Sequence, residues 1–575
     1  MPPESAVTAP APQSAVGPLE RGLAVLRALG ATPSGRARAS DLARETGLAR
    51  STVDRIVSTL ERLDHLRGDP REPSVAPPLM ALGNAYLSAG GLPALLGRPA
   101  RALADELDES VSLAVPDRTG VRFVNQTVRR RTMTVSFRVG DLLPAERCAP
   151  GALFAADWTE ADREAWLARR QQDPLESGFP ALPPRSRGRA PSQEEFAAAT
   201  AAARERGWAV DDQLIEPGLL ALAVPVRGPD GRTVCALSVV SQSSRHDLDS
   251  LRALALDRMR ATAAAMEAAL AAAPAPAERP LPASDLTLGP KDELGPEFLQ
   301  SLARGLAVLT ALGARVGGLT LAETAEATGL SRATARRSLL TLVQLGYAAT
   351  EGRCFRLLPR VLELGHAQLS VLTLPELAQP HLAELVSQVH ESASMAVLDG
   401  DDVRYVARVA TVRIMSVNIT VGTRFPAYAT SMGRVLLAAL PPEQRAVRLD
   451  RAGRLHGFGR NAPTRRTVSS PQQLDALLDG VASEGFALVD QELEEGLRSL
   501  AVPVRDRRGR VVAAVNVSTH AGSGSVEATR EALLPALRAA ADRIEADLAV
   551  IGGGDASGGD ANGGDANGFG DGQAD

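Results

Sequence analysis

The chain has 575 residues, of which 45% are hydrophobic, and a formal net charge of -5 at pH 7. This length suits roughly four domains of about 100–200 residues each, and the charge excludes a protein coated with basic surface, so any nucleic-acid contact must come from local patches. The three cysteines lack Cys-x-x-Cys spacing, which argues against structural zinc or a disulfide framework and fits a reducing cytoplasm. No apolar run reaches about 18 residues and no signal pattern opens the chain, so we expect a soluble cytoplasmic protein without membrane contact or cofactor.

The sequence contains one two-part unit twice. Arg-Gly-Leu-Ala-Val-Leu occurs at 21–26 and again at 304–309. Thr-Gly-Leu at 46–48 returns at 328–330, with an offset of 282 instead of 283 residues. A later segment, 212–225, returns at 490–503 with an offset of 278 residues. A period this long indicates a duplicated domain pair, which matters most if the unit normally works as a symmetric dimer.

Each unit is predicted to begin with a helix and a capped helix–turn–helix. In the second unit, helical spacing of leucines predicts the first helix over 298–312. Thr320 is predicted to cap a short helix, with Glu323 as its capping-box partner. Gly329 permits the tight turn, and Ser331 caps the next helix. Two helices joined by a short Gly-containing turn form a helix-turn-helix.

A β-hairpin wing is predicted after the second helix-turn-helix. Strands at 347–350 and 353–357 are joined by a Glu-Gly turn at 351–352. The corresponding segment of the first unit, 68–73, contains prolines where a hairpin needs donors. We therefore expect the first wing to be loop-like.

The second helix of a helix-turn-helix lies in the major groove with its N-terminal residues at base edges. The candidate DNA-reading residues are Arg332, Thr334, Arg336 and Arg337 in the second copy and Arg50, Thr52 and Arg55 in the first. Arginine can bind guanine or phosphate in a bidentate manner, and threonine suits base edges or backbone. Asp54 replaces Arg336, which predicts slightly different half-sites. The alternative, a merely solvated arginine-rich face, is disfavoured by the repetition.

A longer α/β region follows a predicted linker helix at 360–369. Val-rich runs predict strands, in the second copy at 394–398, 403–410, 415–420, 487–489, 500–504 and 511–518. An Asp-Arg-Arg-Gly turn at 506–509 signals a hairpin. Helices predicted to cover this sheet span 376–391, 433–439, 471–484 and 525–549.

These motifs together resemble the IclR family of bacterial transcriptional regulators. The resemblance rests on Arg-Gly-Leu-Ala-Val-Leu, Thr-Gly-Leu-Ser, the Val-Gly-Thr-Arg-Phe-Pro-Ala-Tyr-Ala-Thr-Ser-Met-Gly-Arg run at 421–434, and the Val-Asp-Gln-Glu-Leu-Glu-Glu-Gly run at 489–496. The resemblance covers nearly all of residues 297–550, and this second copy is similar to the subgroup that controls aromatic-acid catabolism. It also covers residues 19–270, where the first copy is more diverged. It implies a winged helix-turn-helix domain, a GAF-like effector domain, and dimerisation through the DNA-binding domains. A tandem fusion departs from the usual single unit.

The resemblance also implies that a small organic acid binds in a cup on the sheet. The residues of this chain that match the cup are Gly422, Thr423, Ser431, Met432, Gly433, Asp490, Ser499, Asn516 and Ser518. Free N–H groups where a helix begins can hold a carboxylate, and Asn516 and Ser518, two apart, face the same side of a strand. Taken as residues alone, such strand residues often face solvent, and Asp490 could cap a turn.

The two copies differ at the matching cup positions. Met432, Arg498, Ser499, Asn516 and Ser518 are replaced in the first copy by Pro150, Leu220, Ala221, Ser238 and Val240, whereas Asp212 remains in place of Asp490. We therefore hypothesise that the second sensor binds effector and that the first is degenerate and mainly structural.

The predicted architecture is α+β in two tandem units. The expected segments are a disordered tail at 1–18, a winged helix-turn-helix at 19–82, an effector-binding-like domain at 83–270, a Pro-rich linker at 271–296, a second winged helix-turn-helix at 297–360, an effector-binding domain at 361–551 and a disordered Gly/Asp tail at 552–575. The linker, about 26 residues long, could span about 25–30 Å as a flexible coil. One chain could then form an intramolecular pseudo-dimer, with further oligomerisation left open, whose heads enter successive major grooves about 34–36 Å apart.

The expected function is a sequence-specific, effector-responsive transcriptional regulator acting on double-stranded operator DNA. The subgroup suggests protocatechuate, 4-hydroxybenzoate or β-ketoadipate as effector. A constitutive DNA-binding protein that ignores ligands is the alternative. An enzyme using the acidic run 490–495 is disfavoured, because acid–base chemistry there lacks a partnered His, Cys or Lys.

Overall fold

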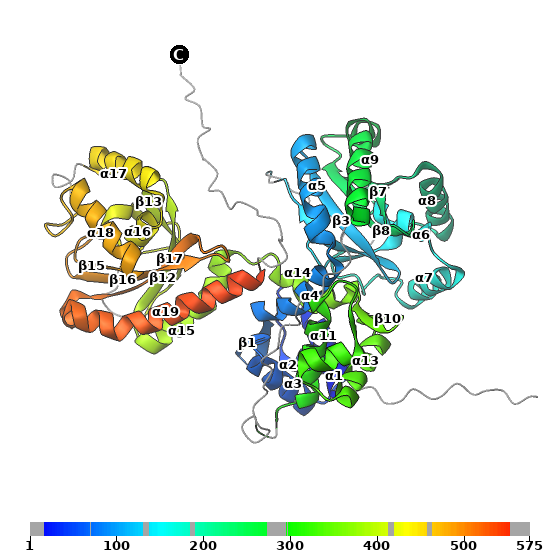
Figure 1. Ribbon diagram of the computed structural model, residues 1–575, viewed down its shortest axis with the longest axis horizontal. Coiled ribbons are helices and arrows are strands. Elements are labelled where there is room, and N and C mark those ends of the chain that lie inside the picture. The colour runs from blue at the N-terminus through cyan, green and yellow to red at the C-terminus, as the bar shows by residue number, and fades with distance from the viewer. Residues whose placement is uncertain are drawn as a thin grey trace, which may run out of the picture. The chain divides into compact units, whose positions relative to one another are not determined.

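A computed structural model describes residues 17–69, 71–129, 131, 137–183, 190–272, 295, 297–411, 419–456 and 463–551. The described residues form two compact units, 17–371 and 372–551 (Figure 1). The first unit contains both predicted helix-turn-helix domains, called heads below, and the first predicted effector domain; the second unit is the second predicted effector domain, and these two domains are called sensors below. The tails and the Pro-rich linker predicted to be disordered lie outside the described residues, except that 17 and 18 begin the first helix, 271 and 272 end another, and 295 is described.

The first head is a winged helix-turn-helix. Its elements are α1 (Gly17–Ala31), α2 (Ala39–Thr46), α3 (Arg50–Arg62), β1 (Leu66–Asp69) and β2 (Glu72–Val75). The turn between α2 and α3 begins at Gly47, whose φ of 68° is left-handed and favours glycine. The N-caps of α2 and α3 are Arg38 and Ala49, and neither side chain caps its helix. The predicted capping is therefore wrong for this copy, since Ala49 offers no acceptor.

The first wing is a β-hairpin, so the prediction of a loop was wrong. β1 and β2 pair antiparallel, with Gly68 opposite Pro73. The Pro73 carbonyl accepts the N–H of Ala37, outside this pair. The N–H that proline lacks would lie on that same side, so its absence removes no bond between β1 and β2.

The second head repeats this arrangement, and its helices α12 and α13 have the side-chain caps that the first head lacks. It comprises α11 (Gln300–Ala311), β9 (Leu319–Thr320), α12 (Leu321–Thr328), α13 (Arg332–Gln344), β10 (Ala348–Glu351) and β11 (Cys354–Leu357). The predicted capping box of Thr320 and Glu323 is confirmed, as is the cap of α13 by Ser331. The wing is a three-stranded sheet in the order β10-β11-β9.

The two heads pack on each other through α1 and α11. A Cβ added at Gly305 would lie 2.5 Å from both methyl carbons of Leu19, and one added at Gly22 would lie 2.4 Å from a methyl carbon of Leu302. Gly22 matches Gly305, and Leu19 matches Leu302, at the offset of 283 residues. The contact is therefore reciprocal, as in an isologous dimer interface, but it joins two parts of one chain.

In each copy, the segment that connects the head to the sensor, called the linker of that copy, packs on the opposite copy. The first consists of a 3₁₀ turn (Pro77–Leu79) and α4 (Met80–Gly90), and the second of a 3₁₀ turn (Pro359–Glu363) and α14 (His366–Leu369). The second linker is not the continuous helix predicted, because Gly365 takes a φ of 99°. A Cβ at Gly365 would lie 2.9 Å from Leu79 Cδ2, so the break accommodates close packing on the first copy.

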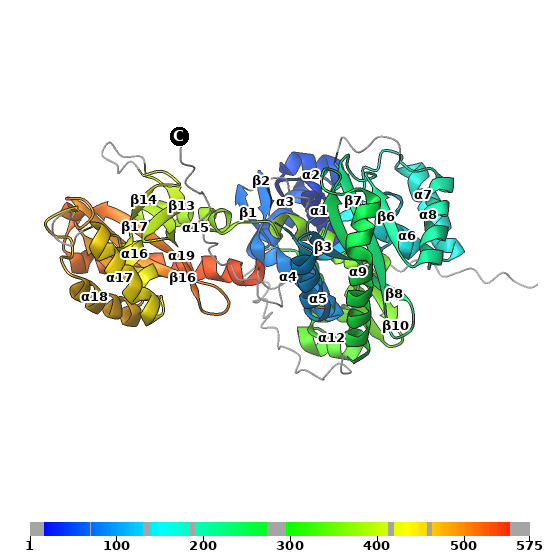
Figure 2. The ribbon, with the colours of Figure 1, turned by 90° about the horizontal axis from the view of Figure 1, so that it is seen from above.

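The first sensor is a six-stranded antiparallel sheet in the order β5-β4-β3-β8-β7-β6. Its strands are β3 (Ser110–Asp117), β4 (Gly120–Thr127), β5 (Leu142–Pro144), β6 (Ala209–Asp212), β7 (Leu219–Arg227) and β8 (Thr233–Gln242). The helices are α5 (Leu92–Leu107), α6 (Ala149–Ala155), α7 (Glu160–Gln172), α8 (Gln193–Arg206) and α9 (Leu248–Ala272). α5 and α9 cover one face, and α6 to α8 lie on the other side of the sheet (Figures 1 and 2).

The second sensor has the same topology, β14-β13-β12-β17-β16-β15. Its strands are β12 (Ser392–Asp399), β13 (Asp402–Val409), β14 (Arg424–Pro426), β15 (Ala487–Asp490), β16 (Leu497–Arg505) and β17 (Val511–His520). Its helices are α15 (Leu374–Val389), α16 (Ser431–Ala438), α17 (Pro442–His456), α18 (Pro471–Glu484) and α19 (Val526–Ile551). α15 and α19 pack on one face, and α16 and α18 on the other, where the predicted cup lies.

Five of the six predicted strands and all four predicted helices of this sensor are present, and the turn at 506–509 is confirmed. Part of the remaining strand, 415–420, lies outside the described residues. The sequence reasoning missed β14 and α17.

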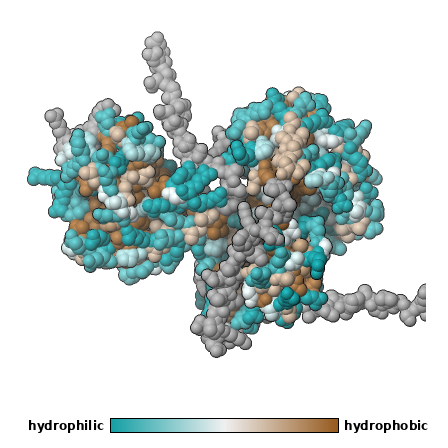
Figure 3. All heavy atoms as spheres, in the orientation of Figure 1, coloured by the Kyte–Doolittle hydropathy of each residue, from teal (hydrophilic) through white to brown (hydrophobic). Residues whose placement is uncertain are grey.

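Large exposed apolar residues are few and spread over the described surface, and Figure 3 shows hydrophobic and hydrophilic residues interspersed on its visible face. In the described part of the chain, no single helix passes the length and hydropathy test for a membrane span, and one bent pair, Pro77–Gly90 with Leu92–Leu107, passes on those two criteria alone.

Candidate functional site

The predicted DNA-reading arginines are exposed at the start of each recognition helix. On α13, Arg332, Arg336 and Arg337 are exposed; Thr334 is half-buried, and its hydroxyl and N–H bond to Ser331. The opposite face of α13 buries Leu339 into the head. The structure thus brings these four side chains together on one surface, the arrangement that groove reading requires.

The two recognition helices differ in their acidic neighbours. On α3, Nε of Arg50 lies 2.8 Å from the carboxylate of Asp54, and Nε of Arg55 lies 3.0 Å from that of Glu297. Within the described ranges, none of the three α13 arginines forms an ion pair with an acid. The second head therefore presents uncompensated guanidinium groups, whereas those of the first are partly neutralised.

Four of the predicted effector residues converge on the inner face of the second sensor. Ser431 at the start of α16 has its Oγ 2.7 Å from that of Ser499 on β16. On β17, Nδ2 of Asn516 donates to Ser499 at 2.8 Å and to Ser518 at 3.0 Å. Three hydroxyls and an amide are thus gathered at one point on this face.

This cluster lines a small cavity that also contains Met432 and Tyr405. The enclosed volume is about 20 Å³, which is room for about one water molecule. Oδ1 of Asn516 is buried there without a hydrogen-bond partner among the described residues. Burial raises the pKa of Tyr405 to about 12, so its phenol stays neutral. An aromatic acid would require the walls to separate.

A cation that the sequence reasoning missed lies on the same face. Arg408 on β13 is paired in register with Ser394, and Ser394 with Asn516. Nη1 of Arg408 lies 3.4 Å from the Ser394 hydroxyl. A β-bulge between Met395 and Ala396 puts Arg408 on the cavity face together with Tyr405. Burial lowers the pKa of Arg408 from its ordinary value. Strand alternation alone would not have revealed this position, since a bulge changes the register.

Other predicted effector residues lie outside the lining of this cavity. The N–H of Gly422 donates to the carbonyl of Tyr405, and the Thr423 hydroxyl accepts from the N–H of Thr420, so both form a turn. The N–H of Gly433 already donates to the Thr430 hydroxyl. A Cβ at Gly433 would lie 2.0 Å from the Ala427 carbonyl oxygen, which makes glycine necessary for the bend. Their binding roles stay predictions.

Asp490 also lies outside the cavity lining and is engaged by two arginines. Its carboxylate accepts from Nε of Arg498 and from Nη1 of Arg466, both at 2.8 Å. Burial raises the pKa of Asp490, but hydrogen bonds from Arg498 and Gln491 and the charges of both arginines outweigh it and lower that pKa. Arg498 also donates to the carbonyls of Gly524 and Ser525, so this pair ties β15 and β16 to the start of α19.

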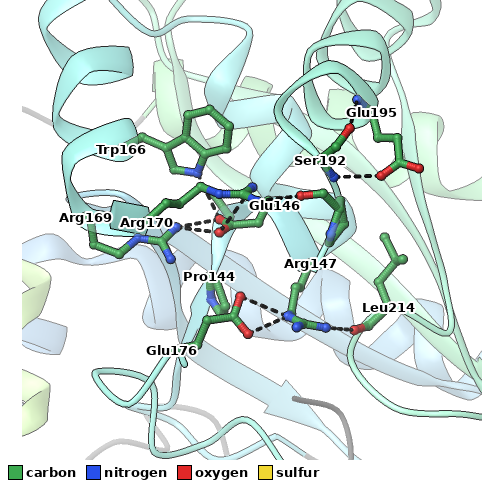
Figure 4. Close-up of polar contacts among 12 residues, drawn as sticks. Pro144, Glu146, Arg147, Trp166, Arg169, Arg170, Glu176, Ser192, Glu195 and Leu214 are labelled. Carbon is green, nitrogen blue, oxygen red and sulfur yellow. Dashed lines mark hydrogen bonds and ion pairs between the residues drawn. The ribbon is translucent and has the colours of Figure 1, made fainter. Parts of the chain in front are cut away.

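The first sensor has a buried ion pair at its corresponding cup. Arg147 stands where the second sensor has the cavity-lining Ala429. Its Nε donates to both carboxylate oxygens of Glu176, at 2.8 and 3.0 Å, and its Nη1 donates to the Leu214 carbonyl (Figure 4). Both ionic side chains are at least 95% buried. Arg147 therefore has an internal carboxylate as its partner, which supports the hypothesis that this copy is structural.

A second buried carboxylate, that of Glu146, lies in the same turn directly before Arg147. Glu146 accepts from Nε1 of Trp166 at 3.0 Å and from Nη2 of Arg169 at 2.6 and 2.7 Å (Figure 4). Nearby, Asp211 replaces cavity-lining Val489 and is fully buried. Burial raises the pKa of Asp211 to about 7, although it accepts the N–H of Leu214. Over the described residues, no group of three or more His, Cys, Asp or Glu could hold a metal ion.

Comparisons with known proteins match both halves of the chain. Residues 18–70 and 301–352 match the model described as the IclR helix-turn-helix domain, and residues 84–268 and 366–546 match the bacterial transcriptional regulator IclR C-terminal domain. Among curated proteins, the Pca regulon regulatory protein of Pseudomonas putida is 49% identical over 246 residues, covering 43% of this chain and 82% of that protein.

Two further relatives have similar coverage. The p-hydroxybenzoate hydroxylase transcriptional activator of Acinetobacter baylyi is 34% identical over 253 residues, which cover 43% of this chain and 91% of that protein. Among solved structures, a transcriptional regulator from Rhodococcus sp. RHA1 is 51% identical, with a TM-score of 0.41, and the match covers 44% of this chain and 99% of that one.

Proposed function

We propose that this chain, which belongs to the IclR family of bacterial transcriptional regulators, senses a small aromatic acid in its second sensor and controls genes of aromatic-compound catabolism. Regulators named for the pca regulon and for p-hydroxybenzoate hydroxylase are 49% and 34% identical to it over about one unit. Protocatechuate and 4-hydroxybenzoate, each with a carboxylate and a ring hydroxyl, are the proposed effector class.

The observation that carries this proposal is the unpartnered oxygen of Asn516. It is buried beside three serine hydroxyls, in the cavity of the second sensor. A buried acceptor without a donor costs roughly 1–3 kcal/mol, and a phenolic O–H of the ligand would satisfy it. The hydroxyls of Ser431 and Ser499 can meanwhile donate to the ligand, which suits an aromatic acid better than an apolar molecule.

Arg408 supplies the charge that the carboxylate needs. It is two register positions from Asn516 along the polar row through Ser394, and a guanidinium can hold a carboxylate in a bidentate manner. Because the cavity holds only about 20 Å³, the acid must bind a more open conformation. Binding then favours that conformation, which is how an effector can shift the equilibrium of the protein.

On the DNA side, we propose that one chain acts as an intramolecular pseudo-dimer. The reciprocal packing of Leu19 on Gly305 and Leu302 on Gly22 supports this reading, because such contacts usually join two subunits. The second head would provide most of the phosphate and base contacts, since its arginines lack acidic partners. A constitutive DNA-binding protein that ignores small acids is the alternative.

Operator binding with and without acid tests the proposal. The full chain is titrated onto labelled DNA from upstream of its own gene, at fixed salt, with protocatechuate, with 4-hydroxybenzoate, and with neither. We expect one acid to change the affinity at least fivefold. The double variant Ser499→Ala/Asn516→Ala should bind DNA normally but lose the response, and Ser238→Ala in the first sensor should keep it. Specific binding that neither acid alters would support the constitutive alternative.

A further inference from the structure

A cavity of about 500 Å³ lies in the first unit where three parts of the chain meet. Its walls come from α1 and α2 of the first head, from β4 and two loops of the first sensor, and from the second linker. This volume is typical of pockets for small molecules. Its lining includes Gly140 and Asp141, which match the turn residues Gly422 and Thr423 of the second sensor, but no residue that lines the second sensor's cavity or matches one that does.

Arg122 of the first sensor lines this cavity and is only 1% exposed. Its Nε donates to Asp117 at 2.5 Å and its Nη1 to the Gly140 carbonyl at 2.6 Å. Its Nη2 has no hydrogen-bond partner in the described part of the chain and lies 3.9 Å from a carboxylate oxygen of Glu363. A buried charged donor of this kind is costly unless something accepts from it.

Two further arginines line the same cavity. Arg27 on α1 and Arg138 before β5 are exposed, and neither side chain forms a hydrogen bond or ion pair with a described residue. The matching residues of the second copy are Thr310 and Thr420. These two charges are therefore peculiar to the first copy and are not required by the shared fold.

The acids in the lining already have donors, with one exception. Glu363 accepts from the Tyr347 hydroxyl at 2.8 Å and from Nε of Arg360 at 2.9 Å. Asp141 accepts the N–H of Arg138 at 2.8 Å, and burial raises the pKa of Asp141, which favours its neutral form. Only Glu45, which is exposed, accepts no hydrogen bond from a described residue. The donors that still lack an acceptor in this cavity are therefore on the arginines Arg27, Arg138 and Arg122.

We propose that this cavity binds a small organic anion whose carboxylate or phosphate group lies between Arg27, Arg138 and Nη2 of Arg122. The site is separate from the effector cavity of the second sensor. Because its walls belong to the first head, the first sensor and the second linker, a bound anion stabilises one arrangement of these three parts. It thereby acts on the geometry of the two heads.

Calorimetry with benzoate and with phenyl phosphate tests the proposal in the full chain. The background carries Ser499→Ala/Asn516→Ala, so that the proposed effector site is silenced and its success or failure does not affect the result. We expect one equivalent of at least one probe to bind per chain. Adding Arg27→Thr and Arg138→Thr, the residues of the second copy, should weaken binding at least tenfold.

A matched control is Arg163→Thr/Arg232→Thr, which removes two exposed arginines of the first sensor elsewhere. It should leave the affinity within twofold. Tryptophan fluorescence during heating verifies folding, because all three tryptophans, Trp158, Trp166 and Trp208, belong to the first sensor. The proposal is overturned if neither probe binds the background variant, or if the folded arginine variant binds as tightly as the control.

Discussion

Leu19 of the first copy lies directly on the bare backbone of Gly305 of the second, where an added Cβ would be 2.5 Å from its methyl carbons. Gly305→Ala should therefore force α1 and α11 apart, with an overpacking cost of about 1–3 kcal/mol. We expect operator affinity to fall at least tenfold, because the spacing of the heads changes. Gly17→Ala, in open space at the start of α1, is the control and should leave affinity unchanged. Unchanged affinity of a folded Gly305→Ala variant would mean that the heads act separately.

Asp54 partly neutralises the first recognition helix through its 2.8 Å pair with Arg50. Asp54→Arg, which copies the second head, should release Arg50 and add a charge. We expect the slope of log K against log salt to steepen by about 1 to 2. Asp41→Arg, at a half-buried position of α2, makes the same charge change away from the recognition helix and should have a smaller effect. Equal slopes for the two variants would place α3 away from DNA.

Local chemistry explains which elements could be predicted from the sequence. The caps by Thr320 and Ser331 depend on residues three positions apart, so the sequence predicted α12 and α13 correctly. The first wing was missed because the consequence of Pro73 depends on which side its missing donor faces. The break at Gly365 reflects contact with Leu79, far away in sequence.

The candidate site also contains some residues that could be predicted from the sequence and others that could not. The convergence of Ser499, Asn516 and Ser518 follows from strand register and could be expected from spacing together with the family resemblance. Arg408 was missed because a bulge changed its face. The pair of Arg147 and Glu176 joins residues 29 apart, on either side of α6 and α7, and sequence periodicity carries no signal for such a contact.

The buried pair of Arg147 and Glu176 should be essential for the first sensor. Glu176→Gln leaves a buried guanidinium without its counter-charge, which typically costs about 3–5 kcal/mol. We expect a clear fall in the midpoint of thermal unfolding followed by tryptophan fluorescence, which reports on this sensor alone. Arg147→Ala/Glu176→Gln, with the alanine of the second copy, should recover part of the loss. Glu160→Gln, at an exposed pair with Arg163, is the control, and an equal effect there would show that the buried pair of Arg147 and Glu176 has no special role in the stability of the sensor.

Asp211 should make the first sensor more stable in mild acid. Its folded pKa of about 7 lies above the ordinary value of 3.8, because burial penalises the charged form. A raised pKa favours the protonated folded state, so this contribution is full below about pH 4 and is lost as pH rises to about 7. Asp211→Asn should therefore stabilise the sensor by roughly 2 kcal/mol at pH 8 and flatten the pH dependence of its tryptophan-detected unfolding between pH 4 and 7. A variant with an unchanged pH profile would contradict this assignment.

Arg408 should distinguish an acid from its neutral analogue in the second sensor. The first sensor has Gln126 at the matching position, so Arg408→Gln is a substitution that this fold already contains. We expect protocatechuate to bind at least tenfold more weakly to the variant, because the guanidinium no longer pairs with its carboxylate. Protocatechualdehyde has the same ring hydroxyls without the charge. It should bind the unmodified chain more weakly than protocatechuate does, and Arg408→Gln should change its affinity less than twofold. Calorimetry on the unmodified chain and on the Arg408→Gln variant measures the two ratios, and an equal loss for acid and aldehyde would show that Arg408 supports the cavity wall instead of binding the carboxylate.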